Sequence, residues 1–169
     1  MDEIAALLEP QIPALRRYAW ALLHSDEAAD DLVQDTLERA ITRWHLRRRD
    51  GDLRAWLFAI ERSLFLSAIR QRKRRGPHVG SEELDDVASD EGHQEASLGA
   101  RDVRAGLDAL PEEQRSVLLL VAVEDLSYAE ASRVLDVPVG TVMSRLSRAR
   151  EKMRRYLGSG RVAVLRRVK

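Results

Sequence analysis

The sequence predicts an all-α protein in which a flexible acidic linker joins two small helical domains. Three observations support this prediction. Ala, Leu, Arg and Glu, which are mostly good helix formers, dominate the composition, whereas aromatic residues make up only 5%. Apolar residues recur every three or four positions on both sides of the chain's centre, as in amphipathic helices. Between these two blocks, residues 76–100 contain seven acidic residues and no Lys or Arg.

Three amphipathic helices are expected in the first domain, residues 1–75. Ser25, followed by Asp26 and Glu27, has the pattern of an N-cap with acids in the first turn of the second helix. The apolar face of the first helix comprises Ile12, Leu15, Ala19 and Leu22, and that of the second comprises Leu32 or Val33, Leu37, Ala40 or Ile41, and Trp44.

The third helix of this domain is expected to follow a break at Gly51 and Asp52. It ends in a run of basic residues, 70–75, and three such helices can bury one shared core. The side chains expected to point inward are Leu53, Trp56, Leu57, Ile60, Leu64 and Ala68.

A linker is expected over residues 76–99. Gly76 and Pro77 end the helical pattern, and the residues that follow mix Gly, Ser, Asp, Glu and His with few apolar anchors. A segment of this length without secondary structure is uncommon inside a compact domain. We therefore interpret it as a flexible connection between two domains.

The second domain is expected over residues 100–158, with a basic tail at 159–169. A helix over residues 98–109 is followed by Pro111, which suits the first turn of a helix that reaches Val123. Ser127 and Glu130 then have the spacing of a capping box at the start of a short helix. After a turn at 136–138, the last helix carries one apolar face, formed by Val142, Leu146, Ala149, Met153 and Leu157.

The short capped helix, the turn and the longer helix predict a helix-turn-helix over residues 127–157. In this motif the second helix lies in the major groove of DNA, and residues near its N-terminus reach base edges. Residues 140–169 contain ten Lys or Arg and a single acid, Glu151. The alternative is a solvated basic helix on a generic bundle. The outward residues are Thr141, Ser144, Arg145, Ser147 and Arg148, whose side chains can bond bases or phosphates.

A second basic cluster, residues 70–75, adjoins a helix that bears Trp56, Phe58 and Phe65. Basic residues beside aromatic ones suit single-stranded nucleic acid, because bases stack on the rings and cations neutralise the backbone. The alternative is that Trp56 belongs to the core and the cluster is a solvated helix end.

Several motifs resemble those of one family. Residues 30–36 (DDLVQDT) and 54–60 (RAWLFAI) resemble region 2 of bacterial sigma factors of the extracytoplasmic-function group, in the sigma-70 family. Residues 110–115 (LPEEQR) through Leu118, 126–130 (LSYAE) and 139–146 (VGTVMSRL) resemble region 4 of the same group. The resemblance covers nearly the whole chain outside the linker and the tail, with the motifs in the family's order.

The resemblance implies a protein that binds core RNA polymerase and directs it to specific promoters. Region 2 would grip the clamp helices of the polymerase β′ subunit and would recognise and help melt the minus-ten element. The implied polymerase-binding residues are Asp31, Leu32, Gln34, Asp35 and Glu38, and the implied minus-ten residues are Arg62, Ser63, Leu64, Arg70, Arg72 and Lys73.

Region 4 would dock on the flap of the β subunit and read the minus-thirty-five element as duplex DNA. The implied contacts come from Thr141, Met143, Ser144, Arg145 and Arg148. The linker would thread towards the active-site cleft and the RNA exit path of the polymerase, and an anti-sigma factor would mask both domains. The sequence departs from the family pattern at Ser63, where asparagine is frequent, at Met143, where lysine is frequent, and at Asp136, where glycine is common.

Other function classes have less support in the sequence. The four histidines are scattered without metal-ligand spacing, and neither a phosphate loop nor a nucleophile motif occurs, so neither an enzyme nor a cofactor or metal is expected. The absence of cysteine, of a signal pattern and of a long apolar run fits a cytoplasmic protein that is not inserted in a membrane. Two binding proteins remain as alternatives: a sigma-like mimic that sequesters an anti-sigma factor, and a simple operator-binding repressor.

Overall fold

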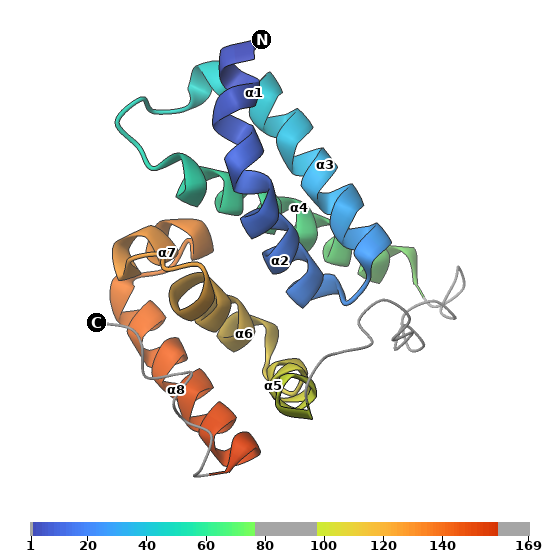
Figure 1. Cartoon of the computed structure of the whole chain (residues 1–169), viewed down its shortest axis with the longest axis vertical. Helices are drawn as coiled ribbons and strands as arrows, with labels where there is room; N and C mark the ends of the chain where they lie inside the picture. Colours follow the sequence, from blue (N-terminus) through green and yellow to red (C-terminus); the bar gives the residue numbers. More distant parts are fainter. Residues whose placement is uncertain (1, 77–97, 159–169) are drawn as a thin grey trace. The chain divides into compact units, whose positions relative to one another are not determined.

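The computed structural model describes residues 2–76 and 98–158, and every secondary-structure element among them is a helix (Figure 1). The predicted all-α class is confirmed. The chain divides into two compact units, Met1–Ser89 and Asp90–Lys169. The predicted linker, apart from its ends, and the predicted basic tail lie outside the described residues. None of the helices in the described ranges is long and apolar enough to cross a membrane.

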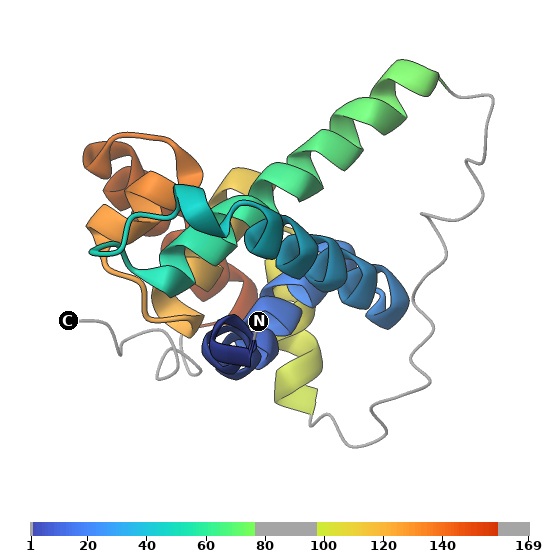
Figure 2. The same cartoon turned by 90° about the horizontal axis from the view of Figure 1, so that it is seen from above.

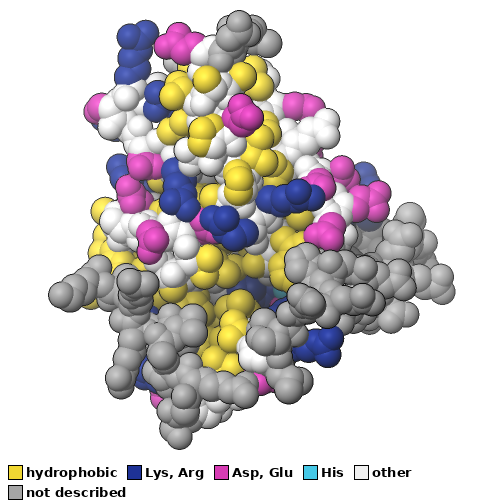
Figure 3. Space-filling view, viewed as in Figure 1, with side chains coloured by type: hydrophobic (Ala, Val, Ile, Leu, Met, Phe, Trp, Pro, Cys, Tyr) yellow, Lys and Arg dark blue, Asp and Glu magenta, His cyan; other side chains and the backbone are white. Residues whose placement is uncertain are grey.

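The first unit contains four α-helices and two short 3-10 turns among its described residues. They are α1 (Asp2–Leu8), η1 (Glu9–Gln11), α2 (Ile12–Leu23), α3 (Asp26–Thr42), η2 (Trp44–Leu46) and α4 (Leu53–Arg75). The three predicted helices correspond to α2, α3 and α4, whereas α1 and the two turns were not predicted. On the face viewed in Figure 3, hydrophobic side chains gather along α1, where Leu7 is 45% exposed.

Side-chain caps define where α3 and α4 begin. The hydroxyl of Ser25 accepts a hydrogen bond from the backbone N–H of Ala28 at 3.2 Å, which confirms the predicted N-cap. The carboxylate of Asp52 accepts one from the N–H of Ala55 at 2.7 Å. Asp52 was predicted only as part of a break, and it also caps the helix that follows the break.

The core of the first unit lies between α2, α3 and α4. Leu15, Tyr18, Leu57 and Phe58 are almost completely buried there. Tyr18 meets Phe58 edge to face, with ring centroids 5.4 Å apart, a geometry that aromatic pairs favour. On α3 the buried positions are Ala29, Leu32, Val33, Thr36 and Ala40, while Ile41 is 42% exposed and Trp44 is half-buried after the helix has ended.

The inward face predicted for α4 was partly wrong. Leu57 and Ile60 are buried, but Leu53, Trp56 and Leu64 are only half-buried and Ala68 is exposed. The prediction missed Phe58, Glu61, Arg62 and Phe65, which are all buried. The N-terminal half of α4 packs against both α2 and α3, so its buried face is wider than a single stripe. Its C-terminal half extends past these helices (Figure 2) and is mostly exposed.

The second unit is a bundle around one long helix. Its elements are α5 (Leu98–Asp108), α6 (Glu112–Leu118), the π-helical segment η3 (Leu119–Val123), α7 (Tyr128–Leu135) and α8 (Val139–Leu157). The helices α5, α6 and α7 all pack on α8. The helix predicted after Pro111 is present as α6, but the chain changes to π-helical geometry from Leu119 onward. The face predicted for α8 is confirmed at Val142, Leu146, Ala149 and Met153, which are buried, while Leu157 is half-buried.

The turn between α7 and α8 holds the two helices in a fixed geometry. The predicted capping box is present, because Ser127 and Glu130 each accept a hydrogen bond from the other's backbone N–H. Asp136 follows α7 in the left-handed conformation (φ 52°, ψ 50°), which aspartate adopts more readily than most residues. The hydroxyl of Ser132 donates to the carbonyl of Val137 across the turn. The predicted helix-turn-helix is thus formed.

Candidate nucleic-acid and polymerase interface

The solvent-facing side of α8 carries a short row of exposed residues opposite its buried face. Met143, Ser144, Ser147 and Arg148 are all exposed and lie at helical spacing. We call these four residues the α8 stripe. The predicted residue Thr141 is half-buried, and the hydroxyl of Ser144 donates to its carbonyl at 3.1 Å. The stripe lies on the second helix of the helix-turn-helix, near its N-terminus, which is where such motifs contact base edges.

Arg145, predicted as an open base-reading residue, is held against α6. Its side chain is only 20% exposed, and its guanidinium lies 3.5 Å from the carboxylate of Glu113. The position of Arg145 explains this, because it lies three residues after Val142 and four before Ala149, both buried. Arg145, predicted as an outward residue, is therefore half-buried and paired with α6.

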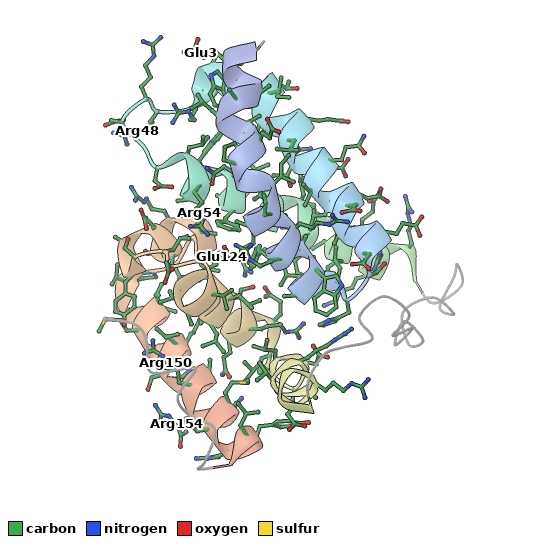
Figure 4. All side chains as sticks on the ribbon, in the orientation of Figure 1. Glu3, Arg48, Arg54, Glu124, Arg150 and Arg154 are labelled. Atoms are coloured by element: carbon green, nitrogen blue, oxygen red, sulfur yellow. The ribbon has the colours of Figure 1, made fainter. Side chains whose placement is uncertain are left out.

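The surface of α8 is strongly basic beyond the α8 stripe. The helix contains six Lys or Arg and one acid, Glu151, which pairs with Arg155. Figure 4 shows Arg150 and Arg154 on this helix. Such a helix gives a polyanion several cations to interact with, which is the main source of affinity in DNA binding.

On α3, four of the five residues predicted to bind the polymerase lie on its surface. Asp31, Gln34, Asp35 and Glu38 are exposed, and the Gln34 amide donates to the Glu38 carboxylate at 3.1 Å. We call these four residues the α3 acidic face. The fifth, Leu32, is only 8% exposed because it belongs to the helix's core-facing side. Leu32, predicted as a polymerase contact, therefore lies beneath the exposed face and supports it from below.

The six residues predicted for the minus-ten element on α4 are divided between core and surface. Ser63, Arg70, Arg72 and Lys73 are exposed, and Leu64 is half-buried. Arg62 is only 6% exposed, since it lies four residues after Phe58 and three before Phe65 on the buried face. Its expected position on an open DNA surface was wrong. Phe58 and Phe65, 0% and 7% exposed, are core residues and have no free face on which a base could stack.

The structure brings together a basic and aromatic cluster that the prediction missed. Trp44 and Trp56, both half-buried, meet at 6.0 Å between ring centroids and an interplanar angle of 74°. The guanidinium of Arg47 lies over Trp44, 5.0 Å from the ring centroid, a favourable cation–π distance. Arg48, which projects from the loop before α4 (Figure 4), and Arg49 follow Arg47 in the chain, and both are exposed. We call Trp44, Arg47, Arg48, Arg49 and Trp56 the Trp–Arg cluster.

A signal for this cluster was present in the sequence. Three consecutive arginines, 47–49, stand between two tryptophans. The prediction assigned both tryptophans to helix faces and did not consider the loop, since the loop's geometry depends on how α3 and α4 pack. Among the described residues, no group of three His, Cys, Asp or Glu is arranged to hold a metal ion.

Two family models match this chain, and known proteins are similar to it in sequence. Residues 8–61 match the model of the sigma2 domain of PhyR, and residues 100–153 match that of sigma-70 region 4. The ECF RNA polymerase sigma factor EcfG of Rhodopseudomonas palustris is 39% identical over 142 residues, covering 84% of this chain and 78% of that protein.

Solved structures agree with these matches. The sigma factor RpoE of Bartonella quintana, crystallised with the anti-sigma factor NepR, superposes with a TM-score of 0.84 at 32% identity, covering 95% of this chain and all of that chain. The anti-anti-sigma factor PhyR of the same organism, also with NepR, has a TM-score of 0.59 at 19% identity, covering 91% of this chain and 50% of PhyR. The likeness to PhyR shows the fold alone.

Proposed function

Because the chain belongs to the extracytoplasmic-function (ECF) group of RNA polymerase sigma factors, we propose that it binds core RNA polymerase and directs it to promoters by contacting two DNA elements. The observation that carries the proposal is the exposed, basic α8 of a capped helix-turn-helix, in a chain that matches region 4 over residues 100–153. The catalytic chemistry of transcription belongs to the polymerase, and this chain acts as its specificity subunit. A partner of core polymerase works in the cytoplasm of a bacterium.

The second unit is proposed to read the minus-thirty-five element as duplex. In this assignment Arg148 is the main base-reading cation, because it is exposed and its guanidinium can bond a guanine through two hydrogen bonds. Met143, Ser144 and the half-buried Thr141 line the same part of the helix. Arg145 contributes from the edge of the interface while Glu113 holds it. The β flap of polymerase is the proposed protein partner of this unit.

The first unit is proposed to bind the β′ clamp helices through the α3 acidic face and to hold the melted minus-ten strand. Taking a base out of a duplex costs a few kcal/mol of stacking and pairing energy. Arg70, Arg72 and Lys73 offer cations to the strand, and Ser63 lies on the same helix. We add the Trp–Arg cluster to this surface, because half-buried indole rings beside arginines can stack bases and neutralise the backbone.

An anti-sigma factor is proposed as a further partner. The relative RpoE was crystallised with the anti-sigma factor NepR, and a structure of CnrH contains the cytosolic domain of CnrY. The likeness of this chain to RpoE, at a TM-score of 0.84 over 95% of its residues, supports a protein partner that binds it in a similar way.

A sigma-like mimic is the second candidate, and one observation favours it: residues 8–61 match the sigma2 domain of PhyR, an anti-anti-sigma factor. Two observations favour the sigma factor instead. The relative EcfG is 39% identical over most of both chains, and the α8 surface is basic and exposed, which a mimic has no need to retain.

In vitro transcription separates these functions. Core polymerase plus this protein should start transcripts at defined sites on genomic DNA, and sequencing the transcripts' 5′ ends gives the promoter elements. Core polymerase alone is the control. Tight binding to an anti-sigma factor without any specific transcript would favour the mimic, and duplex binding without core-polymerase binding would indicate a repressor.

A further inference from the structure

Met143 is the apolar member of the α8 stripe, whose other three residues are polar. It is 52% exposed, whereas the other apolar residues in the middle of α8, from Val142 to Met153, are buried. Its neighbours in the α8 stripe are Ser144, Ser147 and Arg148. It lies on the second helix of the helix-turn-helix, in the part from which such helices reach base edges.

The surroundings of Met143 allow a close approach by DNA. Ser144 and Ser147 are small, and a side chain built at Gly140, three residues before Met143, would meet no atom within 4 Å. The long, flexible methionine side chain is therefore the most prominent apolar group there. Because methionine has three rotatable bonds and a polarisable thioether, it adapts to the surface it meets.

The major groove offers one kind of apolar partner. Each base pair presents hydrogen-bond donors and acceptors there, and only thymine adds an apolar group, its C5 methyl. A thioether in the groove can neither neutralise phosphate nor form the bidentate bonds that arginine forms with guanine. Contact with a methyl group is the remaining favourable interaction, since it removes apolar surface of both partners from water.

We propose that Met143 is a specificity-determining residue that recognises the C5 methyl of a thymine in the minus-thirty-five element. This proposal rests on the proposed function, in which α8 reads that element. Under this proposal Met143 recognises an A·T base pair of the element, and Arg148 recognises guanine. Val139, 41% exposed and one helical turn earlier, lies on the same side of the helix and can extend the apolar contact.

Replacing thymine by uracil tests the proposal, because this change removes only the methyl group. The preferred minus-thirty-five element is first selected from randomised duplexes with core polymerase carrying the full-length protein. Each thymine of either strand is then replaced by uracil in turn. With the wild-type protein, at least one replacement should weaken binding about fourfold, the value expected for one buried methyl group.

The variant Met143→Ala should bind the thymine and uracil duplexes equally at that position. Val123→Ala is the matched control, since Val123 is another half-exposed apolar residue of the second unit, outside α8. It should keep the wild-type preference for thymine. Wild-type binding that is indifferent to every uracil replacement, or Met143→Ala that keeps the full preference, would overturn the role of Met143 while leaving promoter reading intact. If no duplex sequence is preferred at all, both the proposed function and this role are wrong.

Discussion

Gly106 lets α5 approach α8 closely, and replacing it with alanine tests how tightly this contact holds the recognition helix. A Cβ atom at this position would lie 3.0 Å from Cδ1 of Tyr156 and 3.1 Å from both Cε and Sδ of Met153. Contacts this short force the neighbours to move. Tyr156 is 53% exposed and can turn towards solvent, but Met153 is 1% exposed and surrounded by the core.

Two opposing effects determine the stability of Gly106→Ala. Alanine favours the helix over glycine by about 0.5–1 kcal/mol, while overpacking a well-filled core costs about 1–3 kcal/mol. Since Met153 is 1% exposed and enclosed by the core, the overpacking cost should be the larger effect. The expected result is a net loss of about 1 kcal/mol in the free energy of unfolding of the second unit.

Hydrogen exchange of the full-length protein, followed by mass spectrometry, measures this loss locally. Fluorescence is less suitable, because the three tryptophans, Trp20, Trp44 and Trp56, all lie in the first unit. Amides in the centre of α8 should exchange about fivefold faster in Gly106→Ala than in the wild type.

Gly140→Ala is the matched control for Gly106→Ala. It introduces the same methyl group into α8, where nothing lies within 4 Å, and should leave exchange unchanged or slow it. If the amides of Gly106→Ala exchanged no faster than those of the wild type, Met153 would repack without cost. The predicted overpacking cost at the contact between α5 and α8 would then be wrong.

Three further predictions concern the cap, the DNA surface and the polymerase surface. Ser127→Ala removes half of the capping box and should destabilise α7 by about 1 kcal/mol, which hydrogen exchange of its first-turn amides would report. Arg148→Ala should cost about 1–3 kcal/mol in duplex binding and relax the preference at one base pair. Lys152→Ala, the control, should weaken the binding of all duplexes alike. A uniform loss for Arg148→Ala would indicate that Arg148 contacts a phosphate instead of a base. The double variant Asp35→Lys, Glu38→Lys should bind core polymerase more weakly than the wild type in a pull-down titration. Glu9→Lys, which lies outside the α3 acidic face, should not. Undiminished affinity of the double variant would exclude the α3 acidic face as the clamp-binding surface.

The parts of the fold that sequence predicts well are those fixed by neighbours within one helical turn. Ser25 and the Ser127–Glu130 pair are caps whose partners lie three residues away, and all are present. The apolar spacing of α8 likewise gives its buried face, because a single helix side packs on the rest of the unit. Such features depend on local geometry alone, so the sequence contains all the information that they need.

The parts that were missed depend on packing between elements. The wide buried face of α4 follows from its two neighbours, α2 and α3, and places Phe58 and Phe65 in the core. The pair between Arg145 and Glu113 joins α8 to α6 across the unit. Trp44 meets Trp56 only because a loop brings η2 back to the start of α4. Sequence spacing within one helix does not determine any of these contacts.

Two arginines predicted on the DNA surface, one as an outward helix residue and one from the family resemblance, lie on the buried side of their helices for the same geometric reason. Arg62 lies four residues after Phe58 and three before Phe65, and Arg145 lies three after Val142 and four before Ala149. A residue with buried neighbours at both of these spacings lies on the buried side of the helix, and a long aliphatic stem allows arginine to occupy that place.

Arg148 has the opposite surroundings. The residues four before and three after it, Ser144 and Glu151, are exposed, and so is Arg148 itself. Counting basic residues therefore overestimates the DNA-facing surface of an amphipathic helix, whereas the burial of the neighbours at helical spacing identifies which arginines can reach it. By this criterion Arg148 is the recognition-helix cation whose loss should change sequence preference, and Arg145 is one whose loss should first loosen the contact between α6 and α8.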